Sequence, residues 1–219
     1  QRQDPGHRGL TDGGTLLAHL GMSGSLRVLS RELPPRPHDH VDLVLDSGRV
    51  LRFNDPRRFG SLHWIEGDVA THPLLAGLGP EPLEPGFDGE HLWRRARGRR
   101  APPQPFIMKA QGGGGVGNIY ASEALFRAGI RPTAPAGRLS RARMERLAQA
   151  IRAVLGEAIR VGGTTLRDYV APDGAPGYFR QQLFVYERAG EACRRCGAPI
   201  RQRVLGQRST YWCPACQPA

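Results

Sequence analysis

Four cysteines stand in two close pairs near the C-terminal end of this sequence. Cys193 and Cys196 form the first pair, Cys213 and Cys216 form the second, and sixteen residues separate the pairs. Two intervening residues let both thiolates of a pair lie on one side of a tight turn. Two such turns together supply the four sulfurs that tetrahedral zinc prefers. The spacing therefore predicts one structural Zn²⁺, since four sulfurs leave no open position for water or substrate.

The same four cysteines could instead form two disulfides or a redox pair. Disulfides persist in oxidising compartments, which proteins reach through a secretory signal. The first residues of the sequence are polar, and we expect neither a signal peptide nor a membrane span, because the longest apolar stretches are far shorter than a bilayer crossing needs. Zinc is the favoured interpretation.

A second chemically suggestive stretch is the glycine-rich run of residues 112–117, which leads into a helix expected to start at Asn118. Free backbone N–H groups at a helix start, together with the positive end of the helix dipole, favour a phosphate there. No Lys-Ser or Lys-Thr pair follows the last glycine and no clear strand precedes the run, so a Walker loop and a dinucleotide fold are disfavoured. Either Asn118 caps the helix and binds phosphate at once, or the run is a glycine turn without a ligand.

The charge of the sequence favours a polyanionic partner. The formal net charge is +11, the pI is near 10.6, and Lys109 is the only lysine. Between the cysteine pairs lie Arg201, Arg203 and Arg208, and the planar guanidinium matches phosphate oxygens well. The alternative is that the base composition of the source genome replaces lysine with arginine on a solvated surface.

The elements expected around these residues change from strand to helix along the chain. Residues 15–66 have the alternation of an antiparallel sheet, with a hairpin turn at residues 46–49. Residues 78–90 concentrate proline, glycine and acid, which is typical of a connection between domains. Beyond them, the sequence predicts a helix from Asn118 to Gly129 and a longer one behind Ser140 that ends at Gly162 and Gly163. With 39% hydrophobic residues the chain can form one or two cores.

Several longer motifs occur in the same order as in formamidopyrimidine-DNA glycosylases, and from about residue 15 to the end the sequence resembles that family. The motifs are residues 19–26 (HLGMSGSL), 38–42 (HDHVD), 54–60 (NDPRRFG), 115–123 (GVGNIYASE), 162–169 (GGTTLRDY), 176–179 (PGYF) and the cysteine pairs.

The resemblance implies an α+β fold and a role in base-excision repair. We expect a partial antiparallel β-sandwich domain over residues 1–77, a linker over 78–90, a helical helix-two-turns-helix domain over 91–185, and a four-cysteine zinc-finger hairpin over 186–219. The implied activity is that of a DNA glycosylase and AP lyase that removes 8-oxoguanine and formamidopyrimidines. The expected partner is double-stranded DNA with an oxidised purine, bound by a monomer in the cytoplasm at the bacterial nucleoid.

The resemblance also assigns roles to single residues. Eversion of a nucleotide costs a few kcal/mol, and by similarity Met22, Arg57 and Phe59 fill the gap that it leaves. Residues 164–179 match the mobile loop that closes over the everted base. The remaining positions that match DNA-binding residues are His38, Arg99, Asn118 and Arg208, of which Arg208 also matches the arginine of the late elimination step.

The sequence departs from the family at its catalytic end. Family members attack the sugar with the amine of an N-terminal proline, with a neighbouring glutamate as acid and a lysine of the β-domain assisting elimination. Pro5 is internal and its amide nitrogen cannot attack, and Lys109 lies in the helical region. We therefore expect the catalytic end to be absent from this sequence and the activity of the chain as written to be impaired, so a non-catalytic zinc-dependent DNA-binding module is the alternative. Gln104 stands where the family usually has a phosphate-contacting lysine.

Overall fold

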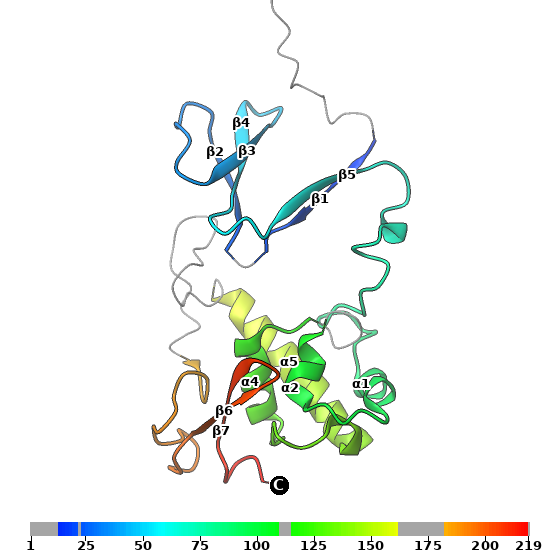
Figure 1. Cartoon of the computed structure of the whole chain (residues 1–219), viewed down its shortest axis with the longest axis vertical. Coiled ribbons are helices and arrows are strands. Elements are labelled where there is room, and N and C mark those ends of the chain that lie inside the picture. The colour runs from blue at the N-terminus through cyan, green and yellow to red at the C-terminus, as the bar shows by residue number, and fades with distance from the viewer. Residues whose placement is uncertain (1–12, 22, 110–114, 162–181, 219) are drawn as a thin grey trace, which may run out of the picture. The chain divides into compact units, whose positions relative to one another are not determined.

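The computed structural model describes residues 13–21, 23–109, 115–161 and 182–218. The described residues gather into two compact units, an N-terminal unit up to Ala76 and a C-terminal unit that starts at Gly77 (Figure 1). The change from strands to helices that the sequence predicts coincides with this division. None of the helices within the described ranges is long and apolar enough to cross a membrane.

The described part of the N-terminal unit forms two antiparallel sheets. One sheet pairs the first strand with the last, and the other has the order β2-β4-β3. The hairpin expected from the sequence is confirmed, because Val44 pairs with Val50 and the Leu45 N–H donates to the Arg49 carbonyl across the turn. The elements are β1 (Thr15–His19), β2 (Ser25–Ser30), β3 (Asp39–Val44), β4 (Arg49–Asn54), β5 (Ser61–Ile65) and a short 3-10 helix, η1 (Val69–Thr71).

A buried arginine holds the edge of the three-stranded sheet in register. Arg52 on β4 is only 4% exposed and faces Asp42 on β3, to which it donates two hydrogen bonds of 2.7 Å. Its remaining donors reach the carbonyls of Leu33 and Pro34. The bonds from Arg52 hold the pKa of the Asp42 carboxyl below its ordinary value. Because a buried charge is costly unless it is paired, this arginine fixes the pairing of the strands and the path of the preceding loop.

In its described residues, the C-terminal unit has four helices and a β-hairpin. The helices are α1 (Gly89–Ala96), α2 (Pro103–Met108), α4 (Asn118–Arg127) and α5 (Arg141–Arg160), with a 3-10 turn η2 (Ala136–Arg138). The hairpin strands are β6 (Arg201–Leu205) and β7 (Arg208–Trp212). Phe87, which lies in the segment expected to be a linker, is completely buried in the helical core. The last part of that segment therefore belongs to the packed C-terminal unit.

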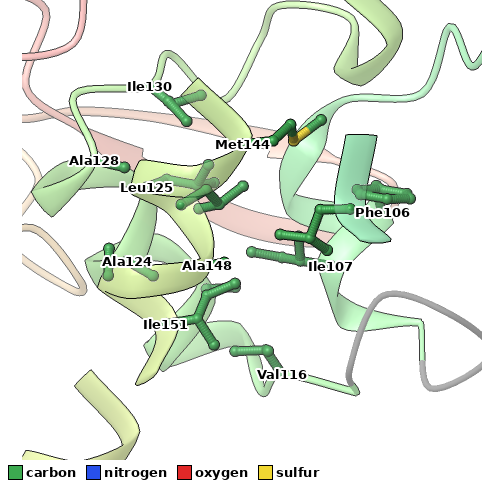
Figure 2. Packing of buried hydrophobic residues seen from close by; sticks show 14 of the residues in the cluster. Phe106, Ile107, Val116, Ala124, Leu125, Ala128, Ile130, Met144, Ala148 and Ile151 are labelled. Atoms are coloured by element: carbon green, nitrogen blue, oxygen red, sulfur yellow. The ribbon is translucent and has the colours of Figure 1, made fainter. Parts of the chain in front are cut away.

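Helix α5 forms the centre of this core. Ser140 caps it, since the Ser140 side chain accepts from the Arg143 N–H, as the sequence predicts. Met144, Leu147 and Ile151 are fully buried on one face of α5 and pack with residues of α2 and α4 (Figure 2). The spacing of these residues matches the helical period, so apolar burial is the main source of the packing. Helix α5 ends at Arg160, and the expected stop at residues 162–163 lies outside the described residues.

Helix α4 is confirmed in position but not in its cap. It starts at Asn118 and ends before Gly129, whose φ of +66° suits a residue without a side chain. The N-cap is Gly117, and no side chain caps the first turn. The expectation that Asn118 caps this helix is therefore wrong. Asn118 is the first helical residue, and its side-chain amide forms hydrogen bonds with Gln104 and with the Ser209 carbonyl.

Candidate DNA interface and zinc centre

The four cysteines come together as the sequence predicts. All four Sγ atoms lie within 4.8 Å of one another, with Sγ–Sγ distances of 3.9 Å for Cys193–Cys216 and 3.4 Å for Cys196–Cys213. A tetrahedral ion with Zn–S bonds of about 2.3 Å places its sulfurs about 3.8 Å apart. The arrangement fits one structural Zn²⁺, and the disulfide alternative is not supported because all four thiols are free.

The thiols differ in their protonation without a metal. Burial disfavours the Cys193 thiolate, but backbone N–H groups of Arg195 and Cys196 outweigh it and lower the pKa of Cys193 to about 7. Burial and the neighbouring thiols raise the pKa of Cys216 to about 12. Zinc binds thiolates, so a bound ion would displace the protons that the neutral thiols hold.

Two buried polar side chains that the sequence did not single out support the zinc segment. Glu123 on α4 accepts three backbone N–H groups, those of residues 184–186, at 2.9, 2.9 and 3.0 Å. Gln217 accepts from the Cys213 N–H at 2.9 Å and donates to the Ile130 carbonyl at 2.8 Å. Together they fix the chain on both sides of the cysteine cluster to the helical core. The Glu123 bonds span at least 61 residues and the bond to Ile130 spans 87, so no local pattern could reveal them.

In the N-terminal unit, the loop after β4 presents an arginine and an aromatic ring to solvent. The Arg57 Cζ lies 4.9 Å from the centroid of the Phe59 ring, and Phe59 is 56% exposed. Asp55 is buried and holds the loop, because its Oδ2 accepts from the Gly60 N–H at 2.7 Å and its carbonyl accepts from the Arg58 N–H at 3.3 Å. The exposed pair is thus carried on a closed, hydrogen-bonded turn.

His38 and the loop around Gly21 adjoin the same turn. The His38 carbonyl accepts from the Asp55 N–H at 2.9 Å, and His38 has the left-handed φ of 71°. A Cβ on Gly21 would lie 2.7 Å from the Phe59 carbonyl carbon, so the Gly21 backbone packs directly against Phe59. Met22, the third residue expected to fill the gap in the DNA, lies outside the described residues.

In the C-terminal unit, the three residues expected to bind DNA lie around helix α2. The Arg99 guanidinium donates to the Arg95 carbonyl at 2.7 Å, and its Cζ is 5.9 Å from the ring of Phe106 on α2. The amide of Asn118 donates to the carbonyl of Ser209, the neighbour of Arg208, at 3.0 Å. Arg99 and Arg208 are both exposed. Each unit therefore gathers its own set of expected DNA-binding residues.

The hairpin that carries Arg208 is held close to α2. Its two-residue turn has positive φ at Gly206 and Gln207, and a Cβ on Gly206 would lie 3.1 Å from the Pro105 side chain. Residues 112–114 of the glycine run and the expected mobile loop of residues 164–179 lie outside the described residues. Gly115 has a φ of 60°, a conformation that favours glycine.

Comparison with protein-family models gives three matches along the chain. Residues 8–62 match the formamidopyrimidine-DNA glycosylase N-terminal domain, residues 78–170 the formamidopyrimidine-DNA glycosylase H2TH domain, and residues 190–219 the zinc finger found in FPG and IleRS. The zinc-finger match agrees with the cysteine geometry, and the structural Zn²⁺ is thereby supported twice.

Curated relatives and solved structures agree with these models. The formamidopyrimidine-DNA glycosylase of Xanthomonas campestris pv. campestris (strain B100) is 59% identical over 205 residues, which cover 94% of this chain and 75% of the relative. That of Thioalkalivibrio sulfidiphilus is 61% identical over 206 residues, covering 94% and 76%. The crystal structure of MutM (Fpg) from Thermus thermophilus matches with a TM-score of 0.83 at 44% identity, covering 94% of this chain and 77% of that one. A Lactococcus lactis Fpg mutant complexed with DNA that contains Fapy-dG matches with a TM-score of 0.84 at 32% identity, covering 95% and 76%. The chain belongs to the formamidopyrimidine-DNA glycosylase family.

Proposed function

We propose that this protein acts in base-excision repair as a DNA glycosylase and AP lyase that removes 8-oxoguanine and formamidopyrimidines from duplex DNA. The curated relatives are named formamidopyrimidine-DNA glycosylase, and their matches cover 94% of the chain. One matching structure is a complex with DNA that contains Fapy-dG. A non-catalytic DNA-binding module is less well supported, because the match includes the N-terminal glycosylase domain as well as the helical and zinc parts.

The single structural observation that carries the proposal is the exposed Arg57–Phe59 pair on its hydrogen-bonded turn. The Phe59 ring is 56% exposed, and the Arg57 Cζ lies 4.9 Å from its centroid, so one turn presents an apolar ring and a guanidinium together. An everted nucleotide leaves a gap between base pairs that such a ring can enter. The guanidinium beside it can then hydrogen-bond the base that has lost its partner.

The C-terminal unit supplies groups for the phosphates. The first turn of α4 has no side-chain cap, so its backbone N–H groups at Asn118 are available to an anion at the positive end of the helix dipole. Arg99, next to Phe106 of α2, and Arg208, on the hairpin that packs against Pro105 of α2, add exposed guanidinium groups. At the late elimination step the departing group is a phosphate, and the positive charge of Arg208 stabilises the negative charge that it takes away.

Binding to a duplex that contains a tetrahydrofuran abasic analogue tests the proposal. The analogue has no base, so it mimics the state in which the gap must be filled. We expect the chain to bind this duplex more tightly than an undamaged one, and Phe59→Ala and Arg57→Ala each to reduce this preference by about tenfold. Competition measured by fluorescence anisotropy gives the ratio of the two dissociation constants.

Arg31→Ala is the matched control, since Arg31 is an exposed arginine of the same unit outside the turn. It should lower both affinities slightly and leave their ratio unchanged. Equal affinities of the wild-type chain for the two duplexes would contradict the proposal. We further propose that the protein acts as a monomer in the cytoplasm at the nucleoid, where its DNA partner lies, and light scattering of the zinc-loaded chain checks the monomer.

A further inference from the structure

A buried amide cluster joins helix α2, helix α4 and the zinc hairpin. Gln104 on α2 is completely buried, and its Nε2 donates to the Oδ1 of Asn118 at 2.6 Å. The Nδ2 of Asn118 donates in turn to the Ser209 carbonyl at 3.0 Å, and the Gln104 Nε2 lies 3.5 Å from the same carbonyl. We call these two side chains and the Ser209 carbonyl the amide clamp.

The clamp fixes which way the Asn118 amide faces. The Oδ1 atom is taken by Gln104, so the Nδ2 atom is the one directed at the hairpin. The reversed orientation would place two amide donors against each other beside the buried Gln104 and leave the Ser209 carbonyl without a donor from Asn118, which is unfavourable. Gln104 contacts the hairpin chiefly through Asn118, and within the described residues its own Oε1 has no partner. Gln104 therefore acts in the clamp through its Nε2 donor.

Three fixed points surround Arg208 along the hairpin. On one side, the turn at Gly206 packs against Pro105 of α2. On the other, β7 runs into the zinc ligand Cys213. The amide clamp holds the carbonyl of Ser209, the residue directly after Arg208. Arg208 is exposed, while the backbone is held at Gly206 before it and at Ser209 after it.

We propose that Gln104 is a positioning residue for Arg208: through Asn118 and Ser209 it fixes the backbone from which the guanidinium reaches a DNA phosphate. The inference rests on the proposed function, because it requires that Arg208 contributes to duplex binding. A donor that is already held in position loses less conformational entropy when it binds, so binding is tighter. Without the donors of Gln104, Arg208 is still present but contributes less to duplex binding.

A double-mutant cycle between positions 104 and 208 tests this role. Gln104→Met keeps the side-chain length and the buried volume but removes both donors. In the wild-type background, we expect Arg208→Ala to weaken binding to the abasic-analogue duplex about tenfold. In the Gln104→Met background, Arg208→Ala should cost less than about threefold, because the arginine no longer starts from a fixed position. Gln149→Met is the matched control, since Gln149 is exposed on α5, and should retain the full tenfold cost.

Zinc content and melting temperature separate positioning from loss of structure. Gln104→Met should retain one zinc per chain; if it fails to fold, Gln104→Leu replaces it in the same cycle. A merely structural role would lower the melting temperature and leave the cost of Arg208→Ala at tenfold, and that result overturns the inference while the proposed function stands. If the wild-type chain shows no binding, or no dependence on Arg208, the premise of the proposed function fails and the inference falls with it.

Discussion

Asp55 forms hydrogen bonds that join His38 to the turn carrying Arg57 and Phe59, the candidate DNA contacts of the N-terminal unit. Its backbone N–H binds the His38 carbonyl, its backbone carbonyl accepts from the Arg58 N–H, and its side chain accepts from the Gly60 N–H. The ring nitrogen Nε2 of His40 also lies 3.0 Å from the Asp55 carbonyl. The carboxylate closes the turn that carries the exposed Arg57–Phe59 pair.

Asp55→Ala should therefore disorder the turn without touching the DNA-contacting side chains. The Gly60 N–H loses its acceptor, which costs about 1 to 3 kcal/mol of unfolding free energy. We expect urea unfolding to report this loss, and the preference for the abasic-analogue duplex to fall as it does in Phe59→Ala. Asp55→Asn keeps an oxygen for the Gly60 N–H and should retain most of the preference. An alanine variant with unchanged preference would show that the turn does not need the carboxylate.

The sequence predicts the role of a single residue where its partners lie close to it along the chain. Two residues between paired cysteines are enough to predict a zinc site, because the ligands of each pair share one turn. Asn118 was misjudged as a helix cap because its partner Ser209 lies 91 residues away. Gln104 stands out in the sequence only as a departure from the family pattern, because its hydrogen-bond partners Asn118 and Ser209 lie 14 and 105 residues away. Bonds between distant segments leave no mark in a local pattern.

Among the elements, helices α4 and α5 are joined by an ion pair as well as by their apolar faces. Arg127 on α4 donates two hydrogen bonds of 2.7 Å to the two carboxylate oxygens of Glu157 on α5. The side chains are 20% and 33% exposed, so solvent screens the pair only in part. Hydrogen bonds from Arg127 lower the pKa of Glu157 below its ordinary value of 4.5.

Removing this pair should give a pH-dependent loss of stability. A carboxyl whose pKa is lower in the folded state stabilises the fold above its unfolded value, here 4.5, and this contribution is lost as the pH falls through the lower folded value. Glu157→Gln should thus lower the unfolding free energy by about 1 kcal/mol at neutral pH. The difference from wild type should shrink below about pH 4.5 as Glu157 protonates.

Urea unfolding of the wild type and of Glu157→Gln across this pH range measures the difference between their unfolding free energies. Any release of zinc in acid affects both chains, so their difference isolates the ion pair. Glu90→Gln is the control, because the two partners of Glu90, Arg94 on α1 and Arg141 on α5, are 73% and 65% exposed, and exposed pairs contribute little to stability at any pH. A Glu157→Gln loss that persists undiminished in acid would mean that packing around residue 157, rather than its charge, holds the two helices.

The elements themselves were predictable where their period is long or their turn is marked. The hairpin of β3 and β4 and the helices α4 and α5 follow from alternation, helical spacing and capping residues. Helices α1 and α2, with eight and six residues, are too short for a helical period to repeat over several turns. Asp88, which caps α1 by accepting from the His91 N–H, was a local signal that the proline-rich surroundings obscured.

Across the whole molecule, the formal net charge of +11 is carried almost entirely by arginine. Many of these arginines are occupied within the protein: Arg52 binds two aspartates, Arg127 binds Glu157, and Arg188 binds Glu191 and two carbonyls. Composition alone could not separate such structural arginines from those that meet a polyanion. The structure makes the distinction by exposure: Arg99 and Arg208 are exposed in the helical unit, and the hydrogen bond from Arg99 to the Arg95 carbonyl comes from its Nε rather than from its terminal nitrogens.

The salt dependence of duplex binding tests this division. Each phosphate contact releases condensed counterions, so the slope of log K against log salt is negative, and its magnitude decreases by about 0.9 for every phosphate contact that is lost. Arg99→Gln and Arg208→Gln should each make the slope less negative by about one, and the double variant by about two. Arg31→Gln removes the same charge from an exposed site of the N-terminal unit and should leave the slope nearly unchanged. Equal slopes in all four variants would assign the binding to net charge spread over the surface, since only specific phosphate contacts make the slope depend on which arginine is removed.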